Sequence, residues 1–206
     1  MNRFFCLLVI IGISVVGCLQ NKPNGQPIEE NETIKVQRNF GEELYKKEFL
    51  KYANQSNLDS LKYELINSFD IYNEEIFRLV HIDAEEVAEF NFVFSLKNLN
   101  EVLQKRNFGL QIEKSKDYQE TYNISINNEE VNLYTHYDLE NNLFWDTAPR
   151  NFFIKVNELL EKQNIDEKFF LLYGGNDLHA ILLTPKQFEI ISENYRNNPK
   201  EKPYLP

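Results

Sequence analysis

The sequence FFLLYGGNDLHAILL, residues 169–183, contains two apolar runs on either side of a short polar turn. Residues 169–173 and 178–183 are apolar at nearly every position, which is typical of strands that are covered on both faces. Between the runs, Gly174 to Asp177 are residue types that a tight connection favours. The pattern therefore predicts a β-hairpin whose two strands are central in a sheet.

An amphipathic helix is predicted on each side of this hairpin. After it, Thr184 is a suitable N-cap, Pro185 fits the first helical turn and Gln187 can complete a capping box. Before it, Pro149 is expected in the first turn of a helix whose apolar side chains recur at helical spacing over residues 152–160.

A second hairpin is predicted upstream of these elements. Apolar and polar residues alternate over residues 122–126 and again over 131–134, as in strands with one buried and one wet face. Asn127 and Asn128 lie between them, and asparagine tolerates the positive φ angles of a tight hairpin turn. Residues 109–113 are a candidate third strand.

Helices alternate with candidate strands in the first half of the chain. Apolar residues at helical spacing predict helices over residues 44–52 and 58–65, and Ser56 is a candidate N-cap for the second. Residues 75–81 fit either a strand or a helix. Residues 90–94 are aromatic and β-branched, which predicts a strand.

The order of these elements indicates the fold class. Asp83 and Glu86 have the spacing of a capping box, and a further helix is expected over residues 96–103. Helices interspersed with antiparallel hairpins predict the α+β class. We expect a single globular domain over residues 35–206, with an antiparallel sheet of hairpins and helices packed on one face.

The N-terminus has the pattern of a secretion signal. Asn2 and Arg3 precede an apolar run over residues 4–16, which is shorter than the roughly 20 residues needed to span a bilayer. The run ends in Val-Val-Gly-Cys, with Gly17 and Cys18 in the last two positions.

This ending resembles the lipobox of bacterial lipoproteins, and the resemblance covers only the N-terminal segment. It implies that residues 1–17 are a signal peptide, that cleavage falls between Gly17 and Cys18, and that acyl chains such as palmitate on Cys18 hold the protein on a membrane of the cell envelope. Leu19, in place of a retention aspartate, points to the outer membrane, facing the periplasm. Residues 18–34 are polar, with three Pro or Gly residues, and are expected to be a flexible tether.

Charge and cysteine content limit the classes of partner. The chain of 206 residues has a formal net charge of −10, which disfavours nucleic acid as a partner. This charge either favours a basic protein partner or serves solubility alone. The two cysteines are Cys6, within the signal, and Cys18, so the globular domain is expected to contain no disulfide.

Most catalytic signatures are missing from the sequence. It contains no phosphate-binding glycine loop, no G-x-S-x-G and no H-E-x-x-H, and neither cysteine falls in the globular domain. We therefore expect no cofactor and no metal in the leading interpretation.

Three histidines nevertheless provide an alternative, because each has an aspartate two residues away. Residues two apart share a face of a strand, so such a pair is either an imidazole oriented by a carboxylate or two metal ligands. If the pairs meet, they would form a metal or acid–base site, and otherwise they are three independent surface pairs. The pairs are His81 with Asp83, His136 with Asp138, and His179 with Asp177.

Two further features are candidates for binding. Asn176 and Asp177, at the tip of the predicted central hairpin, form either a binding loop or simply the turn that a short connection needs. Trp145, the only tryptophan, is either a residue that fixes a helix start on the core or a hot spot for a partner.

Three functions follow from these observations. The first is an envelope lipoprotein, not an enzyme, whose acidic domain binds another protein; its general character resembles that of immunity lipoproteins, which neutralise toxins delivered into the envelope. The second is a metal-dependent or acid–base enzyme that uses the His/Asp pairs. The third is a structural or assembly factor of the outer membrane.

Overall fold

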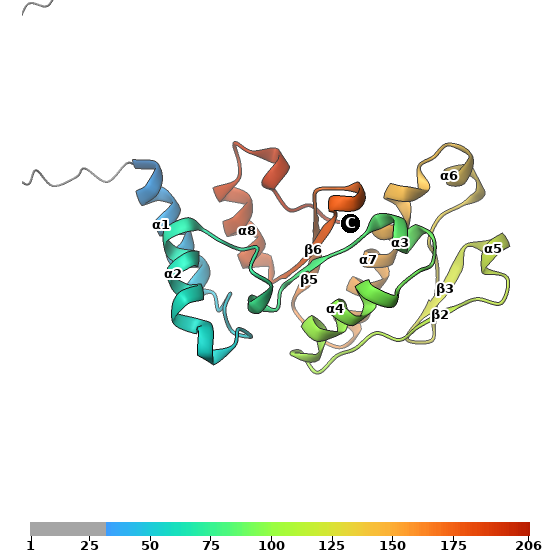
Figure 1. Cartoon of the computed structure of the whole chain (residues 1–206), viewed down its shortest axis with the longest axis horizontal. Coiled ribbons are helices and arrows are strands. Elements are labelled where there is room, and N and C mark those ends of the chain that lie inside the picture. Colours follow the sequence, from blue (N-terminus) through green and yellow to red (C-terminus); the bar gives the residue numbers. More distant parts are fainter. Residues whose placement is uncertain (1–31) are drawn as a thin grey trace, which may run out of the picture. The chain divides into compact units, whose positions relative to one another are not determined.

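Two three-stranded antiparallel sheets organise residues 32–206, which are the residues that the computed structural model describes (Figure 1). The central sheet contains, in spatial order, β1 (Leu79–His81), β6 (His179–Leu183) and β5 (Lys168–Leu172). The second sheet contains β2 (Ile112–Lys114), β3 (Asn123–Ile126) and β4 (Glu129–Asn132), also in spatial order.

Helices make up most of the remaining structure. Within residues 32–206, no helix is both long and apolar enough to cross a membrane. The helices are α1 (Glu32–Lys46), α2 (Leu58–Ser68), α3 (Ala84–Ala88), α4 (Val93–Gln104), α5 (Tyr118–Thr121), α6 (His136–Glu140), α7 (Phe144–Lys162) and α8 (Pro185–Asn194). Helix α1 thus includes residues 32–34, which the sequence analysis assigns to the end of the tether.

The predicted hairpin is confirmed as β5 and β6, and both of its faces are buried. Only β6 is central as predicted, because β5 lies at an edge of the sheet. Leu171 and Leu182 belong to a larger apolar cluster. Phe170 and Ile181 belong to a smaller one on the opposite face of the sheet, because successive side chains of a strand point to opposite faces. The sheet therefore separates two hydrophobic cores.

Helices cover both faces of the central sheet, whereas we expected them on one face. The smaller cluster is completed by α1, α2 and α8, and the larger by α3, α4 and α7. The reason is that β5 and β6 are apolar at successive positions, so each face needs its own cover. The second sheet does bury a single face, with Ile124 and Ile126 in the larger cluster. The α+β class and the single domain are confirmed.

The turns of the two hairpins differ in length and in the residues that adopt positive φ angles. In the second sheet, Asn127 and Asn128 have φ angles of 50° and 66°, which confirms the predicted tight turn. The central hairpin is longer, because Gly175 to Asp177 form a short 3-10 turn, η3 (Gly175–Asp177). Its positive φ angles fall on Tyr173 and Gly175, both at 60°.

Several local predictions need correction. The strand predicted over residues 90–94 is wrong: Phe90, with φ of 61°, lies in the turn that follows α3, and α4 begins at Val93. Phe92 packs against α7 instead, with its ring stacked on that of Phe152 at a distance of 5.6 Å. Pro149 lies inside α7, because that helix begins earlier than predicted.

The N-terminal helices also differ in their bounds from the prediction. Helix α1 ends at Lys46, so Phe49 and Tyr52 lie in the turns that follow it. Helix α2 begins at Leu58 as predicted, with Asn57 at its N-cap. The ambiguous residues 75–81 form the end of a 3-10 turn and then β1.

A buried ion triad joins elements from both halves of the domain. Glu167, just before β5, accepts hydrogen bonds from Arg78, just before β1, and from Arg106, whose Nε lies 2.8 Å from its Oε2. All three residues are buried. Burial alone would raise the pKa of Glu167, but the hydrogen bonds and positive charges of the two arginines outweigh it and hold the pKa below its usual range.

Candidate functional site

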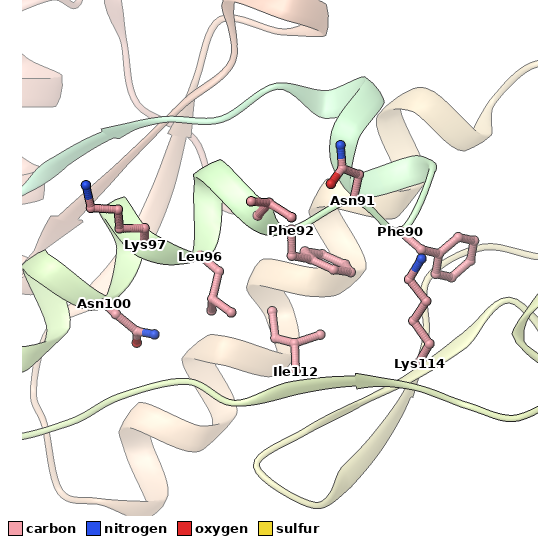
Figure 2. Close-up of a pocket in the computed structure, with 9 residues that line it drawn as sticks. Phe90, Asn91, Phe92, Leu96, Lys97, Asn100, Ile112 and Lys114 are labelled. Atoms are coloured by element: carbon pink, nitrogen blue, oxygen red, sulfur yellow. The ribbon is translucent and has the colours of Figure 1, made fainter.

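A groove of about 500 Å³ lies between the start of α4 and the edge strand β2 (Figure 2). Leu96 and Phe92 extend from the helix towards Ile112 of the strand and form its apolar floor. The remaining lining residues are Phe90, Asn91, Val93, Lys97, Asn100 and Lys114. Hence the groove combines an apolar floor with a polar and basic rim.

Two large apolar side chains are exposed beside this groove. Phe92, Leu96 and Leu99 recur at helical spacing and turn inwards, so Val93 and Phe94 are left on the outer face of α4. Val93 is 72% exposed and Phe94 is 70% exposed. Val93 lines the groove and Phe94 follows it in the chain, and adjacent exposed apolar residues of this kind are typical of interaction surfaces.

The outer edge of β2 borders the same groove. The backbone of Gln111 accepts a hydrogen bond from Asn127 at 2.9 Å, and that of Ser115 donates one to Asn123 at 3.3 Å, so both residues pair towards β3. In an antiparallel pair, backbone groups of alternate residues point to opposite edges. The backbone groups of residues 110, 112 and 114 therefore point away from β3.

The outer edge of β2 faces α4, as the contact between Leu110 and Asn100 of that helix shows. Its side chain donates from Nδ2 to the carbonyl oxygen of Leu110 at 3.0 Å and accepts from the Leu110 N–H at 2.7 Å. It therefore acts as a substitute strand partner for one residue. Among residues 32–206, the outward backbone groups of Ile112 and Lys114 have no comparable partner.

The rim of the groove carries positive charge. The Lys97 ammonium lies 4.0 Å from Glu101 on a side chain that is 77% exposed, and that of Lys114 lies 4.9 Å from the ring centre of Tyr118. An exposed ion pair at 4.0 Å is worth little, so the Lys97 ammonium remains available to a ligand, and Lys114 is itself exposed. No histidine, cysteine, serine or carboxylate is among the described residues that line the groove.

The structure brings together two of the three histidines of the predicted His/Asp pairs. His81 on β1 and His179 on β6 are cross-strand partners, with ring centres 4.9 Å apart. His81 Nε2 donates to the carbonyl oxygen of Asn176 at 2.9 Å, and His179 Nδ1 donates to that of Asp177 at 2.8 Å. The η3 turn thus binds the imidazoles through its backbone.

Two of the three aspartates cap helices. Asp83 is the N-cap of α3 and accepts from the Glu85 N–H at 2.9 Å. Asp138 completes a capping box with Thr135 at the start of α6, and hydrogen bonds from Thr135 lower the pKa of Asp138. Each of these carboxylates therefore stabilises a helix start.

His136 is placed on a different element from the other two histidines. It lies on α6, with Nδ1 3.3 Å from the Tyr122 hydroxyl and Nε2 3.4 Å from Glu140. Within residues 32–206, no group of three or more His, Cys, Asp or Glu side chains is arranged to hold a metal ion. The predicted three-pair site is therefore not assembled as one cluster.

The other predicted binding residues are now placed. Asn176 and Asp177 are exposed at the end of the central hairpin. Trp145 is partly buried in the first turn of α7, with its ring 4.1 Å from that of Phe144 and packed against the larger cluster. Gly17 and Cys18 lie outside the described residues.

Comparison of the chain with models of protein families, with curated proteins and with solved structures gives no match.

Proposed function

We propose that this chain is a lipid-anchored protein of the bacterial cell envelope whose acidic domain binds another protein at the groove between α4 and β2. The proposed anchor is Cys18, which follows the lipobox-like residues. The proposed role is that of an immunity or inhibitor protein, in which binding itself is the activity.

The observation that carries the binding function is the coincidence of three features at one place. Val93 and Phe94 expose apolar side chains, the groove beside them has an apolar floor, and the edge of β2 offers free backbone groups. Each feature favours contact with a polypeptide. The lining residues include no histidine, cysteine, serine or carboxylate, and their two lysines suit the binding of an acidic group.

The binding function is tested by affinity purification of the full chain from detergent-solubilised envelope. We expect a specific protein to be enriched with the native chain and lost with the double variant Val93→Glu, Phe94→Glu. Tyr63→Glu is the matched control, because Tyr63 is 69% exposed on α2, a helix of the smaller cluster. Equal enrichment with all three proteins would contradict binding at the groove.

The anchor is tested separately by mass spectrometry of the processed N-terminus. We expect a chain that begins at Cys18 and carries acyl groups, and Cys18→Ala should release the protein from membranes. A free thiol at Cys18, or a retained signal peptide, would contradict the lipoprotein proposal.

The His81 and His179 pair is the observation that favours the enzyme alternative. Each donated N–H leaves the other ring nitrogen of a neutral imidazole as an acceptor, and the two rings lie 4.9 Å apart across the strands. Titration with Zn²⁺, followed by the histidine NMR signals, tests this alternative. Binding that is abolished by His81→Ala and not by His136→Ala would support a two-histidine metal site.

A further inference from the structure

We propose that the groove captures its partner as an extended strand, which pairs with the outer edge of β2 and places an acidic side chain two residues from an apolar one. This inference rests on the proposed function and specifies the partner segment. It follows from the free backbone groups of β2, the apolar floor beside them and the two lysines on the rim.

The free edge sets the register of the bound strand. Ile112 and Lys114 each direct an N–H and a carbonyl group away from β3, which gives an incoming strand two residues with which to pair. The site ends at Leu110, because Asn100 already occupies both of its backbone groups. A partner segment therefore pairs across from Ile112 and Lys114 and stops before Asn100.

Strand geometry then determines the side chains that the segment needs. Residues two apart on a strand share one face, and an added strand lies about 4.8 Å from its neighbour. The residue opposite Ile112 faces the floor formed with Phe92 and Leu96, which favours an apolar side chain. The residue opposite Lys114 lies two positions away, where a carboxylate complements the ammonium.

Lys97 is a second basic residue of the groove. It lines the groove together with Lys114, but Figure 2 shows that it projects from α4 away from β2, at the other end of the groove. The selection for a carboxylate therefore rests on Lys114, which belongs to the strand itself. The net charge of −10 still favours a partner that is basic as a whole, but the docking segment itself is acidic.

Two other sheet edges, those of β5 and β4, are less suited to an acidic strand. Along the outer edge of β5, Phe169 is paired with the side chain of Asn157, and Leu171 is paired with the backbone of Tyr204. The edge strand β4 begins with Glu129, which is paired with Lys155 and Lys162, and with Glu130, whose carboxylate would repel an acidic segment. The edge of β2 is open and bordered by lysines.

The test uses the full chain in detergent and a short peptide of about seven residues, a typical strand length. The probe is Thr-Thr-Ile-Thr-Glu-Thr-Thr and the same peptide with Ile and Glu exchanged, because the added strand can run in either direction. We expect saturable binding of one of them by fluorescence anisotropy. Replacing Glu by Lys in that peptide should weaken binding by about tenfold.

Two modifications distinguish strand pairing from general stickiness. N-methylation of a peptide amide that faces β2 removes one hydrogen bond and should weaken binding by about tenfold, whereas N-methylation of the next amide should have little effect. On the protein, Lys114→Glu should weaken binding of the Glu-bearing peptide. The same variant should strengthen binding of the peptide in which Lys replaces Glu. The matched control is Lys116→Glu, because Lys116 is an exposed lysine that does not line the groove.

Three results would overturn the strand proposal. The first is that the effects of N-methylation do not alternate along the peptide. The second is that Lys114→Glu and Lys116→Glu weaken binding equally. The third is that sedimentation shows a dimer which Lys114→Glu dissociates, because a second copy of the chain would then occupy the groove. If the peptides fail while the envelope partner is still lost with the Val93 and Phe94 variant, strand capture is wrong and protein binding stands. If the peptides bind but no protein is enriched from the envelope, the edge of β2 does accept a strand and the proposed envelope partner is wrong.

Discussion

The side chain of Asn100 on α4 pairs with both backbone polar groups of Leu110, at 3.0 Å and 2.7 Å. The side chain of Asn157 on α7 does the same for Phe169, at 2.9 Å and 2.7 Å. In both cases an amide on a helix replaces the missing neighbour of a strand residue. Leu110 and Phe169 therefore have no backbone group left for a further strand on that side, and beyond Leu110 the outer edge of β2 stays open.

Substituting either asparagine by alanine should lower the free energy of unfolding, because backbone groups then lose their hydrogen-bond partners. Asn157→Ala leaves buried groups of Phe169 unpaired, so we expect a loss of about 2 to 3 kcal/mol in the free energy of unfolding. Asn100→Ala should cost less, about 1 kcal/mol, because the groups at Leu110 are only partly buried. Urea unfolding monitored by circular dichroism measures both. Equal losses for the two variants would contradict this account.

The buried triad around Glu167 predicts a pH-dependent stability. The pKa of Glu167 is lowered in the folded protein, so its stabilising contribution is complete above its unfolded pKa of about 4.3 and is lost as the pH falls through the folded pKa. Glu167→Gln removes the charge that compensates Arg78 and Arg106, and should cost about 3 to 5 kcal/mol at neutral pH.

Unfolding experiments between pH 7 and the acid range check this prediction. The difference between the native protein and Glu167→Gln should shrink below about pH 4 as the carboxylate is protonated. Glu113→Gln is the control, since Glu113 is exposed and should leave the stability almost unchanged at every pH. A difference that stays constant with pH would refute the role of the Glu167 charge.

The contact between α1 and α2 depends on Gly41. A Cβ atom at this position would lie 2.4 Å from the Leu65 carbonyl oxygen and 2.7 Å from Cα of Ile66, so Gly41→Ala must push the helices apart. We expect a loss of about 1 to 3 kcal/mol in thermal unfolding. Gly109→Ala is the control, because its nearest neighbour, Oδ1 of Asn100, is 3.6 Å away. Similar melting temperatures for both variants would be inconsistent with a tight helix crossing.

The Asn127-Asn128 turn makes a prediction about residue type. Asn128 has a φ of 66°, a conformation that costs a β-branched residue about 1 to 2 kcal/mol. Asn128→Val should therefore destabilise the domain by about that amount, whereas Asn128→Gly should not. The free energies of unfolding of the two variants provide the comparison, and a stable Asn128→Val protein would argue against the turn.

The sequence predicts the features that depend on neighbouring residues. Asn127 and Asn128 indicate a turn, and the apolar runs of β5 and β6 indicate strands buried on both faces. The capping residues Asp83 and Thr184 are also found where local spacing places them. These patterns are visible because hairpins and helix caps form from residues close together in the chain.

Features that join distant segments were not predicted. The groove depends on α4 packing near β2, and its open edge depends on Asn100 reaching Leu110 but not Ile112. The pairing of His81 with His179 depends on the register between β1 and β6. Asp138 lies two residues from His136, which predicts a histidine partner, but it also lies three residues after Thr135, which is the spacing of the capping box that the structure contains.

Hydrogen exchange of three consecutive amides, at Ile112, Glu113 and Lys114, measures most directly whether β2 receives a strand. We predict that the bound peptide slows exchange at Ile112 and Lys114 by about tenfold or more. The Glu113 amide, which points towards β3, should change little. Unchanged exchange at Ile112 and Lys114 in a saturated complex, or equal slowing at all three amides, would contradict the proposal that the partner adds a strand to this edge.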